Sequence, residues 1–171
     1  GRCRWRHLPW GSDHWLTHGE MMPADGLAEL AGADAVLLGA VGDPRVPDHV
    51  TLHGLLLPIR RRFDQFLCVR PVVLHPGVRS PLRKLEQVSV DLVVYRENTE
   101  GEYADVGGRL YQGTEAEVAI QGNVFTRRGC RRIMDAAFQA ARARRNKVSS
   151  ITQANAQAYG MALWDEGFRE T

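Results

Sequence analysis

The sequence contains few cysteines and no long hydrophobic run. Cys3, Cys68 and Cys130 are scattered over 171 residues, and no pair has the Cys-X-X-Cys spacing. A small, odd number of cysteines favours reduced thiols, as in the cytoplasm, over a disulfide framework. No apolar stretch approaches the length of a membrane span, and the basic first residues lack the apolar core of a secretion signal. We therefore expect a cytoplasmic protein with no membrane partner.

The chain also lacks a strong excess of charge of either sign. Its 22 basic and 20 acidic residues give a net charge of +2, which is too balanced for a nucleic-acid-binding surface. The basic residues at 60–62, 127–132 and 142–145 are clustered, but such clusters are typical of solvated helix surfaces. We therefore predict no nucleic-acid partner.

Two common ligand-binding patterns are missing as well. The sequence has no Gly-X-Gly-X-X-Gly or P-loop motif, and the glycine-rich loop at 39–45 is a weak signal by itself. The pairs His14/His18 and His49/His53 have helical metal-ligand spacing, but they lack acidic or cysteine partners in pattern. We interpret these histidines as surface or loop residues.

Hydrophobic periodicity and turn residues predict alternating strands and helices, which indicates an α/β layered fold. Helices are predicted at 23–33 with Asp25 as N-cap, at 55–65 with Pro58 in the first turn, after an N-cap at Thr126, and at 155–168. Strands are predicted at 34–42, 66–74 with an interruption at Pro71, 88–97 and 147–152, and a hairpin or arm at 107–125. The stripe after Thr126 is core: Cys130, Ile133, Met134, Ala137, Phe138 and Ala141.

Three arginines and one tyrosine are the most informative residues. Arg70 lies in an otherwise apolar strand and needs a carboxylate partner from the protein or from a ligand. Arg96 ends another apolar strand; a local pair with Glu97 is disfavoured because adjacent strand residues point to opposite faces. Arg60 borders a helix stripe and could equally be a surface residue. Together with Tyr103, these arginines predict a pocket for a small molecule with more than one carboxylate.

Three long segments carry a family resemblance: HGEMMPADG, LLGAVGDPRVPDHVTLHGLLLPIRR and RENTEGEYADVGGRLYQGTE. They resemble the isocitrate/isopropylmalate dehydrogenases, the metal-dependent β-decarboxylating dehydrogenases, and are most similar to the tartrate and D-malate dehydrogenase branch. The similarity runs from about Trp10 to the C-terminus. It implies an incomplete isopropylmalate-dehydrogenase-like layered fold with a mixed sheet and flanking helices. Residues 1–70 would belong to the cofactor-side domain and 71–171 to the substrate and dimerisation domain.

The resemblance implies NAD-dependent oxidative decarboxylation of a small 2-hydroxy diacid of the D-malate or tartrate type, with Mg²⁺ or Mn²⁺. Arg60, Arg70 and Arg96 would hold the substrate carboxylates. Leu56 would contact the variable part of the substrate, and leucine offers no hydrogen bond to the third carboxylate of isocitrate. Tyr103 would protonate the carbanion or enol that remains after CO₂ leaves.

The resemblance also suggests cofactor contacts and one departure from the family. Gly42 and Asp43 would lie along the nicotinamide cofactor, and Asn155 is a further cofactor-binding candidate. Gln153 stands where the family has a lysine, which the partner subunit supplies and which helps remove the proton of the substrate hydroxyl. Glutamine has no titratable group, so we expect a rate loss of about 100-fold or more if proton transfer depends on this position.

The chain is expected to be truncated at both ends relative to the family. The family's metal-binding aspartates lie beyond the position of Thr171, so no metal ligand is assigned in this chain. The adenosine-binding loop lies further on, and the first glycine-rich strand lies before Gly1. A homodimer is expected through the 107–125 arm and helices.

Alternatives remain open at this stage. The chain could be a non-catalytic subunit that binds a diacid or a homologous partner, or an isopropylmalate dehydrogenase, because Leu55 and Leu56 also suit an alkyl group. A third alternative is an unstable gene fragment without function, which predicts non-cooperative melting. The choice of diacid and of NAD over NADP also stays open.

Overall fold

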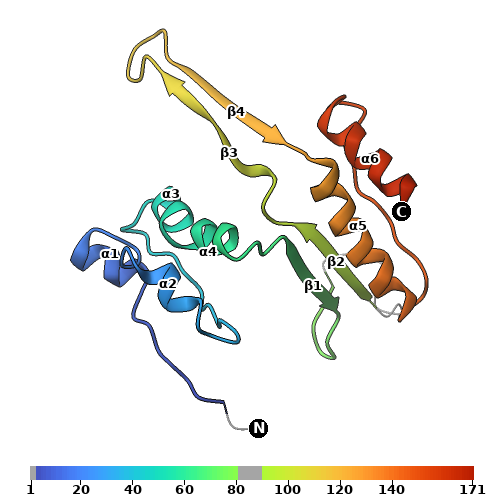
Figure 1. Ribbon diagram of the computed structural model, residues 1–171, viewed down its shortest axis with the longest axis horizontal. Coiled ribbons are helices and arrows are strands. Elements are labelled where there is room, and N and C mark those ends of the chain that lie inside the picture. Colours follow the sequence, from blue (N-terminus) through green and yellow to red (C-terminus); the bar gives the residue numbers. More distant parts are fainter. Residues whose placement is uncertain (1–2, 81–89) are drawn as a thin grey trace. The chain divides into compact units, whose positions relative to one another are not determined.

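The computed structural model describes residues 3–80 and 90–171. The chain divides into two compact units, Gly1–Gln65 and Phe66–Thr171 (Figure 1). None of the helices in the described ranges is both long and apolar enough to cross a membrane. The assignment of residues 1–70 to the cofactor and 71–171 to the substrate stays a prediction.

Unit 1 consists of short helices around a small apolar core. Its elements are α1 (Ser12–His18), α2 (Gly26–Leu30), α3 (Asp48–Thr51), the π-helix η1 (Leu52–Leu56) and α4 (Leu57–Arg62). The core is formed by Met21, Leu30, Val46, Leu55 and Ile59. Gly54 allows the helix to pack closely, because a Cβ there would lie 2.8 Å from the Met21 Cγ.

The π-helix explains how Pro58 is accommodated in unit 1. The predicted helix begins earlier than residue 55, because α3, η1 and α4 follow one another from Asp48 to Arg62. A proline ring clashes with the carbonyl four residues before it, and it lacks an N–H. Here the Leu57 N–H bonds to the Leu52 carbonyl, five residues back. This wider turn just before Pro58 relieves the clash that an α-helix would impose.

Two predictions in unit 1 need correction. Residues 34–42 form no strand, although their apolar run is typical of one. Leu37 is 81% exposed; a strand needs a hydrogen-bonded neighbour, and none of the described residues supplies one. The helix at 23–33 is only Gly26–Leu30. The Asp25 carbonyl accepts from the Ala28 and Glu29 N–H groups, so its backbone begins this helix and its side chain does not cap it.

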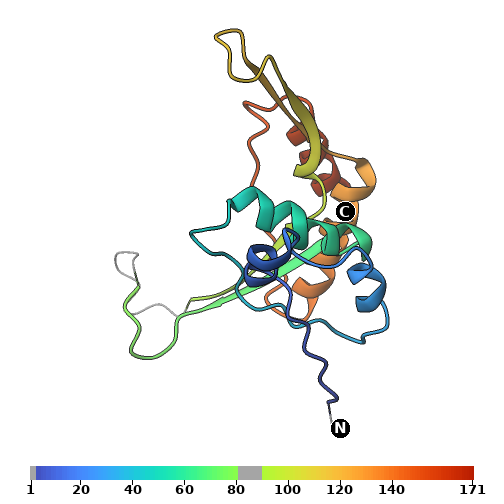
Figure 2. The same ribbon diagram turned by 90° about the vertical axis from the view of Figure 1, so that its left-hand side faces the viewer.

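Unit 2 combines two antiparallel strand pairs with two helices. Strand β1 (Leu67–Val73) pairs with β2 (Asp91–Glu97), and β3 (Gly101–Leu110) pairs with β4 (Val118–Val124). The predicted hairpin is confirmed, and Figures 1 and 2 both show it projecting away from α5 (Arg127–Arg142) and α6 (Gly160–Glu170). Together with the helices, these sheets confirm the α/β class, with both described strand pairs antiparallel.

Helix α5 forms the core of unit 2, as predicted. The Thr126 hydroxyl accepts from the Gly129 N–H at 2.9 Å and caps the helix. The predicted stripe faces inward, and Ile133 is 1% exposed. Helix α6 packs on α5, with the rings of Phe138 and Phe168 5.4 Å apart. Burial of this stripe holds the helix against β2 and α6.

Three other boundaries in unit 2 differ from the predictions. Residues 147–152 form no strand; contacts such as the Trp164 Nε1 donation to Ser150 Oγ at 2.9 Å hold this segment instead of a ladder. The last helix starts at Gly160, because residues 153–157 form a separate tight turn. Pro71 does not interrupt β1 but pairs with Val93. Proline is tolerated there because β1 is an edge strand.

Candidate functional site

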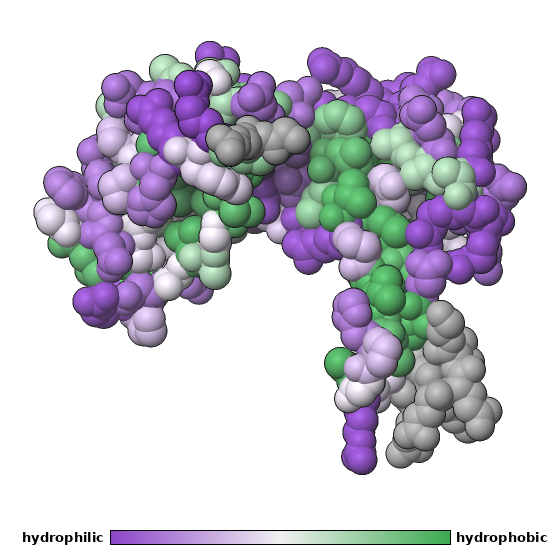
Figure 3. Space-filling model, turned by 90° about the horizontal axis from the view of Figure 1, so that it is seen from below, coloured by the Kyte–Doolittle hydropathy of each residue, from purple (hydrophilic) through white to green (hydrophobic). Residues whose placement is uncertain are grey.

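The β1–β2 pair has two different faces. Glu97 pairs with Arg132 and Asp91 pairs with Arg144, so α5 and the residues after it cover one side of β2, which we call the covered face; on β1 the same side is exposed, at 47% for Val69 and 53% for Val73. The other side carries the residues that alternate with these, and we call it the open face: Cys68, Arg70, Val72, Leu92, Val94 and Arg96. Val72, Leu92 and Val94 are 42%, 44% and 42% exposed. Figure 3 shows an apolar band over one side of unit 2.

Arg70 and Arg96 lie on the open face together. Arg70 is directly opposite Val94, two residues before Arg96, which makes the two arginines diagonal neighbours. Diagonal neighbours in an antiparallel pair have Cα atoms about 7–8 Å apart, within joint reach of one small dianion. Arg70 is exposed, and it has no ion pair with any residue in 3–80 or 90–171. The two arginines therefore share one face, and their joint role in holding a diacid stays a prediction.

A turn between two strands brings Tyr103 next to Arg96. Strand β2 ends at Glu97 and β3 begins at Gly101, where φ is +66°, a conformation that suits glycine. The Arg96 Nη1 donates to the Tyr103 hydroxyl at 3.4 Å, and the guanidinium carbon lies 5.4 Å from the ring centroid. A hydroxyl that accepts from a guanidinium keeps its own O–H as a donor. The pair combines a fixed positive charge with a phenolic proton.

The polar residues around this turn bind different partners. Asn98 is 6% exposed, and its Oδ1 accepts from Arg96 Nη2 at 2.7 Å. The Glu97 carboxylate accepts from the Thr99 and Glu100 N–H groups at 2.8 and 2.6 Å. As expected, Glu97 points away from Arg96. It binds Arg132 across the covered face at 2.9 Å.

The Glu100 carboxylate links this turn to the start of α5. It accepts from the Thr126 N–H at 2.9 Å and from the Thr126 hydroxyl at 2.6 Å. A Cβ at Gly129 would lie 2.1 Å from this carboxylate, so a larger residue there would displace the Glu100 side chain. The turn that carries the arginine and the tyrosine is therefore tied to the core helix of unit 2.

A family model for isocitrate/isopropylmalate dehydrogenase matches residues 2–171. The chain belongs to this family. It is 51% identical over 158 residues to a probable tartrate dehydrogenase/decarboxylase of Agrobacterium vitis, covering 92% of this chain and 44% of the relative. It is 49% identical over 162 residues to D-malate dehydrogenase [decarboxylating] of Escherichia coli (strain K12), covering 93% and 45%. The chain thus spans less than half the length of these relatives.

Solved structures agree with the family fold. An isocitrate dehydrogenase from Methylococcus capsulatus superposes with a TM-score of 0.77 at 26% identity, covering 94% of this chain and 45% of that one. A second protein, from Thermus thermophilus, gives a TM-score of 0.74 at 24% identity, covering 94% of this chain and 31% of that one, and supports the fold alone. The predicted family and layered fold are therefore confirmed.

In this dehydrogenase-family chain, unit 1 carries four of the predicted site residues. Leu56 ends η1, and Arg60 lies in α4; both are half-buried. Gly42 has φ +150°, which requires glycine. The Asp43 carboxylate accepts from Arg45 Nε and Nη2 at 2.9 and 2.7 Å, and these hydrogen bonds lower its pKa to about 2. Asp43 therefore stabilises its own loop.

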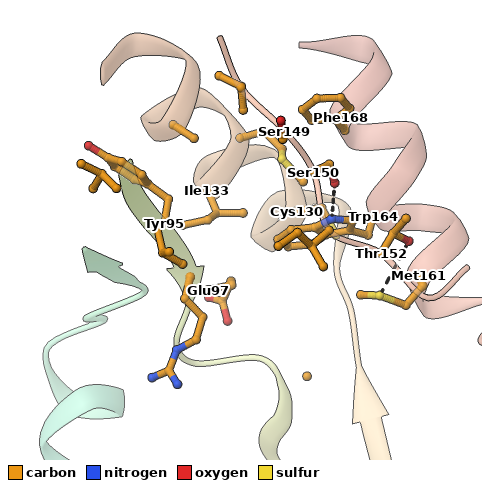
Figure 4. A pocket seen from close by; sticks show the side chains of 18 of the residues that line it. Tyr95, Glu97, Cys130, Ile133, Ser149, Ser150, Thr152, Met161, Trp164 and Phe168 are labelled. Atoms are coloured by element: carbon orange, nitrogen blue, oxygen red, sulfur yellow. Dashed lines mark hydrogen bonds between the residues drawn. The ribbon is translucent and has the colours of Figure 1, made fainter. Parts of the chain in front are cut away.

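Gln153 and Asn155 lie in the tight turn after residue 152, and both are exposed. The Gln153 amide oxygen accepts from Gln157 Nε2 at 3.3 Å. Gln153, Arg96 and Tyr103 all contribute to the lining of one cavity of about 920 Å³. Figure 4 shows that much of its wall is apolar: Cys130, Ile133, Met161, Trp164 and Phe168 surround it. Such apolar walls do not suit a dianion, whereas Arg96 and Tyr103 contribute polar groups to the same lining.

The described residues do not supply a metal site. Within 3–80 and 90–171, no three His, Cys, Asp or Glu side chains are grouped so that they could hold an ion. His14 and His18 stack at 4.3 Å, and the His14 Nδ1 lies 2.8 Å from the Glu20 carbonyl oxygen. These contacts fit the interpretation that they are surface residues. Gly42 and Asp43 belong to unit 1 and Asn155 to unit 2, and their joint role in cofactor binding stays a prediction.

The sequence predicted the arginines and Tyr103 as site residues, but it did not indicate the residues that contact Arg96 and support the turn beside it. Asn98, Glu100 and Arg132 were not assigned, although all three contribute to the site or its support. One signal was available for Asn98: it stands two positions after Arg96, on the same side of an extended chain. The contacts of Glu100 and Arg132 span 26 and 35 residues, and no local pattern indicates them.

Proposed function

We propose that this chain forms the diacid-binding part of an NAD-dependent, decarboxylating 2-hydroxy diacid dehydrogenase of the D-malate or tartrate type. The observation that carries this proposal is the shared open face of Arg70 and Arg96, with Tyr103 beside Arg96. Relatives that are about half identical to it are named tartrate dehydrogenase/decarboxylase and D-malate dehydrogenase.

Substrate recognition on the open face would use both charge and shape. Arg70 and Arg96 would each hold one carboxylate, because a guanidinium matches a carboxylate with two parallel N–H donors. Val94 lies directly opposite Arg70 and offers an apolar surface beside the two charges. The family resemblance also assigns a substrate carboxylate to Arg60 and the variable part of the substrate to Leu56. This arrangement supports a short diacid over a monocarboxylate.

Tyr103 would supply a proton in the decarboxylation half of the reaction. When the C–C bond of the β-keto acid breaks, CO₂ leaves and its electron pair forms an enolate. Tyr103 would transfer its phenolic proton to the enolate carbon and regain a proton from solvent. Arg96 supports this role, because its donation to the phenolic oxygen stabilises the negative charge that develops there.

The redox half of the reaction needs a nicotinamide cofactor and a divalent metal ion in addition to the described residues. Bound NAD⁺ would supply a hydride acceptor, and bound Mg²⁺ or Mn²⁺ would supply a Lewis acid. The described residues include no grouped ligands for such an ion. We therefore derive no step through either group from this chain.

A second candidate is a non-catalytic subunit that binds a diacid. Gln153 favours it, because this residue stands at the lysine position of the family and its amide is hydrogen-bonded to Gln157. An amide can position a substrate or a water molecule but cannot accept the hydroxyl proton as a base. The open face would then bind a ligand without turnover.

A homodimer through the 107–125 arm is part of the proposal. Four apolar side chains of this hairpin are 44–62% exposed: Val106, Leu110, Val118 and Ile120. Exposed apolar residues on a projecting strand pair support burial against a second subunit. Sedimentation analysis of the purified chain tests this expectation.

Calorimetric titration of the purified chain with D-malate and meso-tartrate tests diacid binding. We expect Arg70→Ala and Arg96→Ala each to weaken diacid binding by about 10- to 100-fold, because each removes a charge-assisted bidentate contact. Arg142→Ala is the matched control: this exposed arginine ends α5, outside the open face, and its loss should change the dissociation constant less than twofold. Lactate, a monocarboxylate, should bind much more weakly.

Addition of NAD⁺ and Mn²⁺ separates the two candidates. NADH absorbance that appears with a bound diacid, and that increases in Gln153→Lys, supports the enzyme. Binding without NADH in both proteins supports the non-catalytic subunit. Equal affinity of wild type, Arg70→Ala and Arg96→Ala for both diacids would contradict the proposed site in either form.

A further inference from the structure

Asn98 is the polar residue whose burial the proposed chemistry does not yet explain. Among residues 3–80 and 90–171, it is the one polar side chain buried to the degree of the core, with 6% exposure. A buried amide is unfavourable unless hydrogen bonds satisfy it. Asn98 directly follows β2 and lies in neither a helix nor a strand ladder, so regular secondary structure does not account for its burial.

The hydrogen bond between Asn98 and Arg96 accounts for the burial of Asn98. The Asn98 Oδ1 accepts from Arg96 Nη2 at 2.7 Å, a distance typical of a hydrogen bond from a charged donor. The adjacent Nη1 is directed to the Tyr103 hydroxyl at 3.4 Å. Because the guanidinium is planar, two contacts on different nitrogens determine the orientation of its plane. The buried Nε has no acceptor among the described residues.

The backbone that carries Asn98 is itself held in place. The Glu97 carboxylate accepts from the N–H groups of Thr99 and Glu100, so the turn around Asn98 is closed from both sides of the residue. Glu97 is in turn bound to Arg132 of α5 at 2.9 Å. The orientation of the Arg96 guanidinium is therefore transmitted from the core helix through Glu97 and Asn98.

We propose that Asn98 is a positioning residue that orients the Arg96 guanidinium for the diacid and for Tyr103. Arginine loses considerable rotamer freedom when it binds a ligand. A guanidinium that is already held in the bound orientation loses less, and the ligand binds more tightly. This inference rests on the proposed diacid site, and it assigns Asn98 a task in it that requires no contact with the ligand.

A double-mutant cycle on diacid affinity tests this role. We expect Asn98→Ala to weaken D-malate binding about tenfold, the scale of one lost charge-assisted hydrogen bond. In the Arg96→Lys background the same change should have less than a twofold effect, because an ammonium has no plane to orient. Asn98→Asp keeps an acceptor at the same place and should retain the orientation, with weaker binding from its added charge.

The matched control is Gln139→Ala, which removes an exposed amide side chain from α5 and should leave the affinity unchanged. Thermal unfolding of each variant separates positioning from folding. An equal weakening by Asn98→Ala in both backgrounds would overturn the proposal, as would unchanged affinity in a chain that binds D-malate.

A second measurement decides the case if wild type binds no diacid. Side-chain NMR signals of the Arg96 Nη hydrogens, assigned by their loss in Arg96→Lys, report the held guanidinium directly. We expect slow rotation and protected exchange in wild type and Asn98→Asp, and fast exchange in Asn98→Ala. Identical exchange in all three proteins would show that Asn98 does not hold Arg96. Absent diacid binding with protected signals would refute the proposed function and leave the contact itself intact.

Discussion

The two faces of the β1–β2 pair show how neighbouring residues acquire different tasks. Glu97 and Arg96 are adjacent in sequence, yet Glu97 is bound by Arg132 of α5 while Arg96 faces the open side with Tyr103. On the covered face, the charged side chains Asp91 and Glu97 find arginine partners within unit 2. On the open face, Arg70 has no ion-pair partner among the described residues. The covered face contributes to the packing of unit 2, and the open face is the one that we propose for the ligand.

The largest effect on stability is expected from a substitution in α5, the helix that packs on the covered face. Ile133→Ala should lower the free energy of unfolding by about 3 kcal/mol, because it removes a fully buried side chain and leaves a cavity in the core. Diacid affinity should change little at temperatures where the variant is folded. Chemical denaturation followed by circular dichroism measures the stability change.

The matched change on the open side is Val94→Ala. Val94 is 42% exposed, so its truncation should cost less than about 1 kcal/mol. A loss of stability in Val94→Ala equal to that in Ile133→Ala would mean that the open face is packed in the protein, and the distinction between the two faces would be wrong.

An effect smaller than that of Ile133→Ala should follow when the ion pair across the covered face is broken. Glu97→Gln should lower the free energy of unfolding by about 2 kcal/mol, because it removes the negative charge that pairs with the largely buried Arg132 at 2.9 Å. Glu166→Gln is the control: its pair with Arg127 is about half exposed and should contribute less than about 0.5 kcal/mol. Urea unfolding of both variants measures the difference. Equal effects would contradict a special role for Glu97.

The smallest effect concerns pH. Burial, and then the negative charges of Glu100 and Glu97, raise the pKa of the Cys130 thiol to about 11 from 9.0. Because the folded state favours the protonated thiol, its contribution is fully present below pH 9 and is lost as the pH rises towards 11. Unfolding midpoints should therefore fall over this range in wild type and fall less in Cys130→Ala. Cys3→Ala, which changes an exposed thiol, should behave like wild type; a Cys130→Ala curve parallel to wild type would contradict the assignment.

Local sequence patterns predicted those elements whose stabilising partners lie nearby. Helix α5 was predicted correctly, because its Thr126 cap and its apolar stripe are both contained in one stretch of chain. The hairpin of β3 and β4 was also predicted, because its strands are joined by a short connection. The strand predicted at 34–42 failed, because an apolar run becomes a strand only where another strand pairs with it.

The sequence by itself determined the family, because long motifs are visible without coordinates. It also predicted the three arginines and the tyrosine as site residues, because an arginine in an apolar strand is visible in the same way. Only the tertiary structure decided which of these residues meet. The register of β1 and β2 places Arg70 and Arg96 on one face, and the turn after Glu97 returns Tyr103 to Arg96. It also decided that Asn98 is buried against Arg96. Register, turns and burial depend on contacts between distant parts of the chain, which no local pattern specifies.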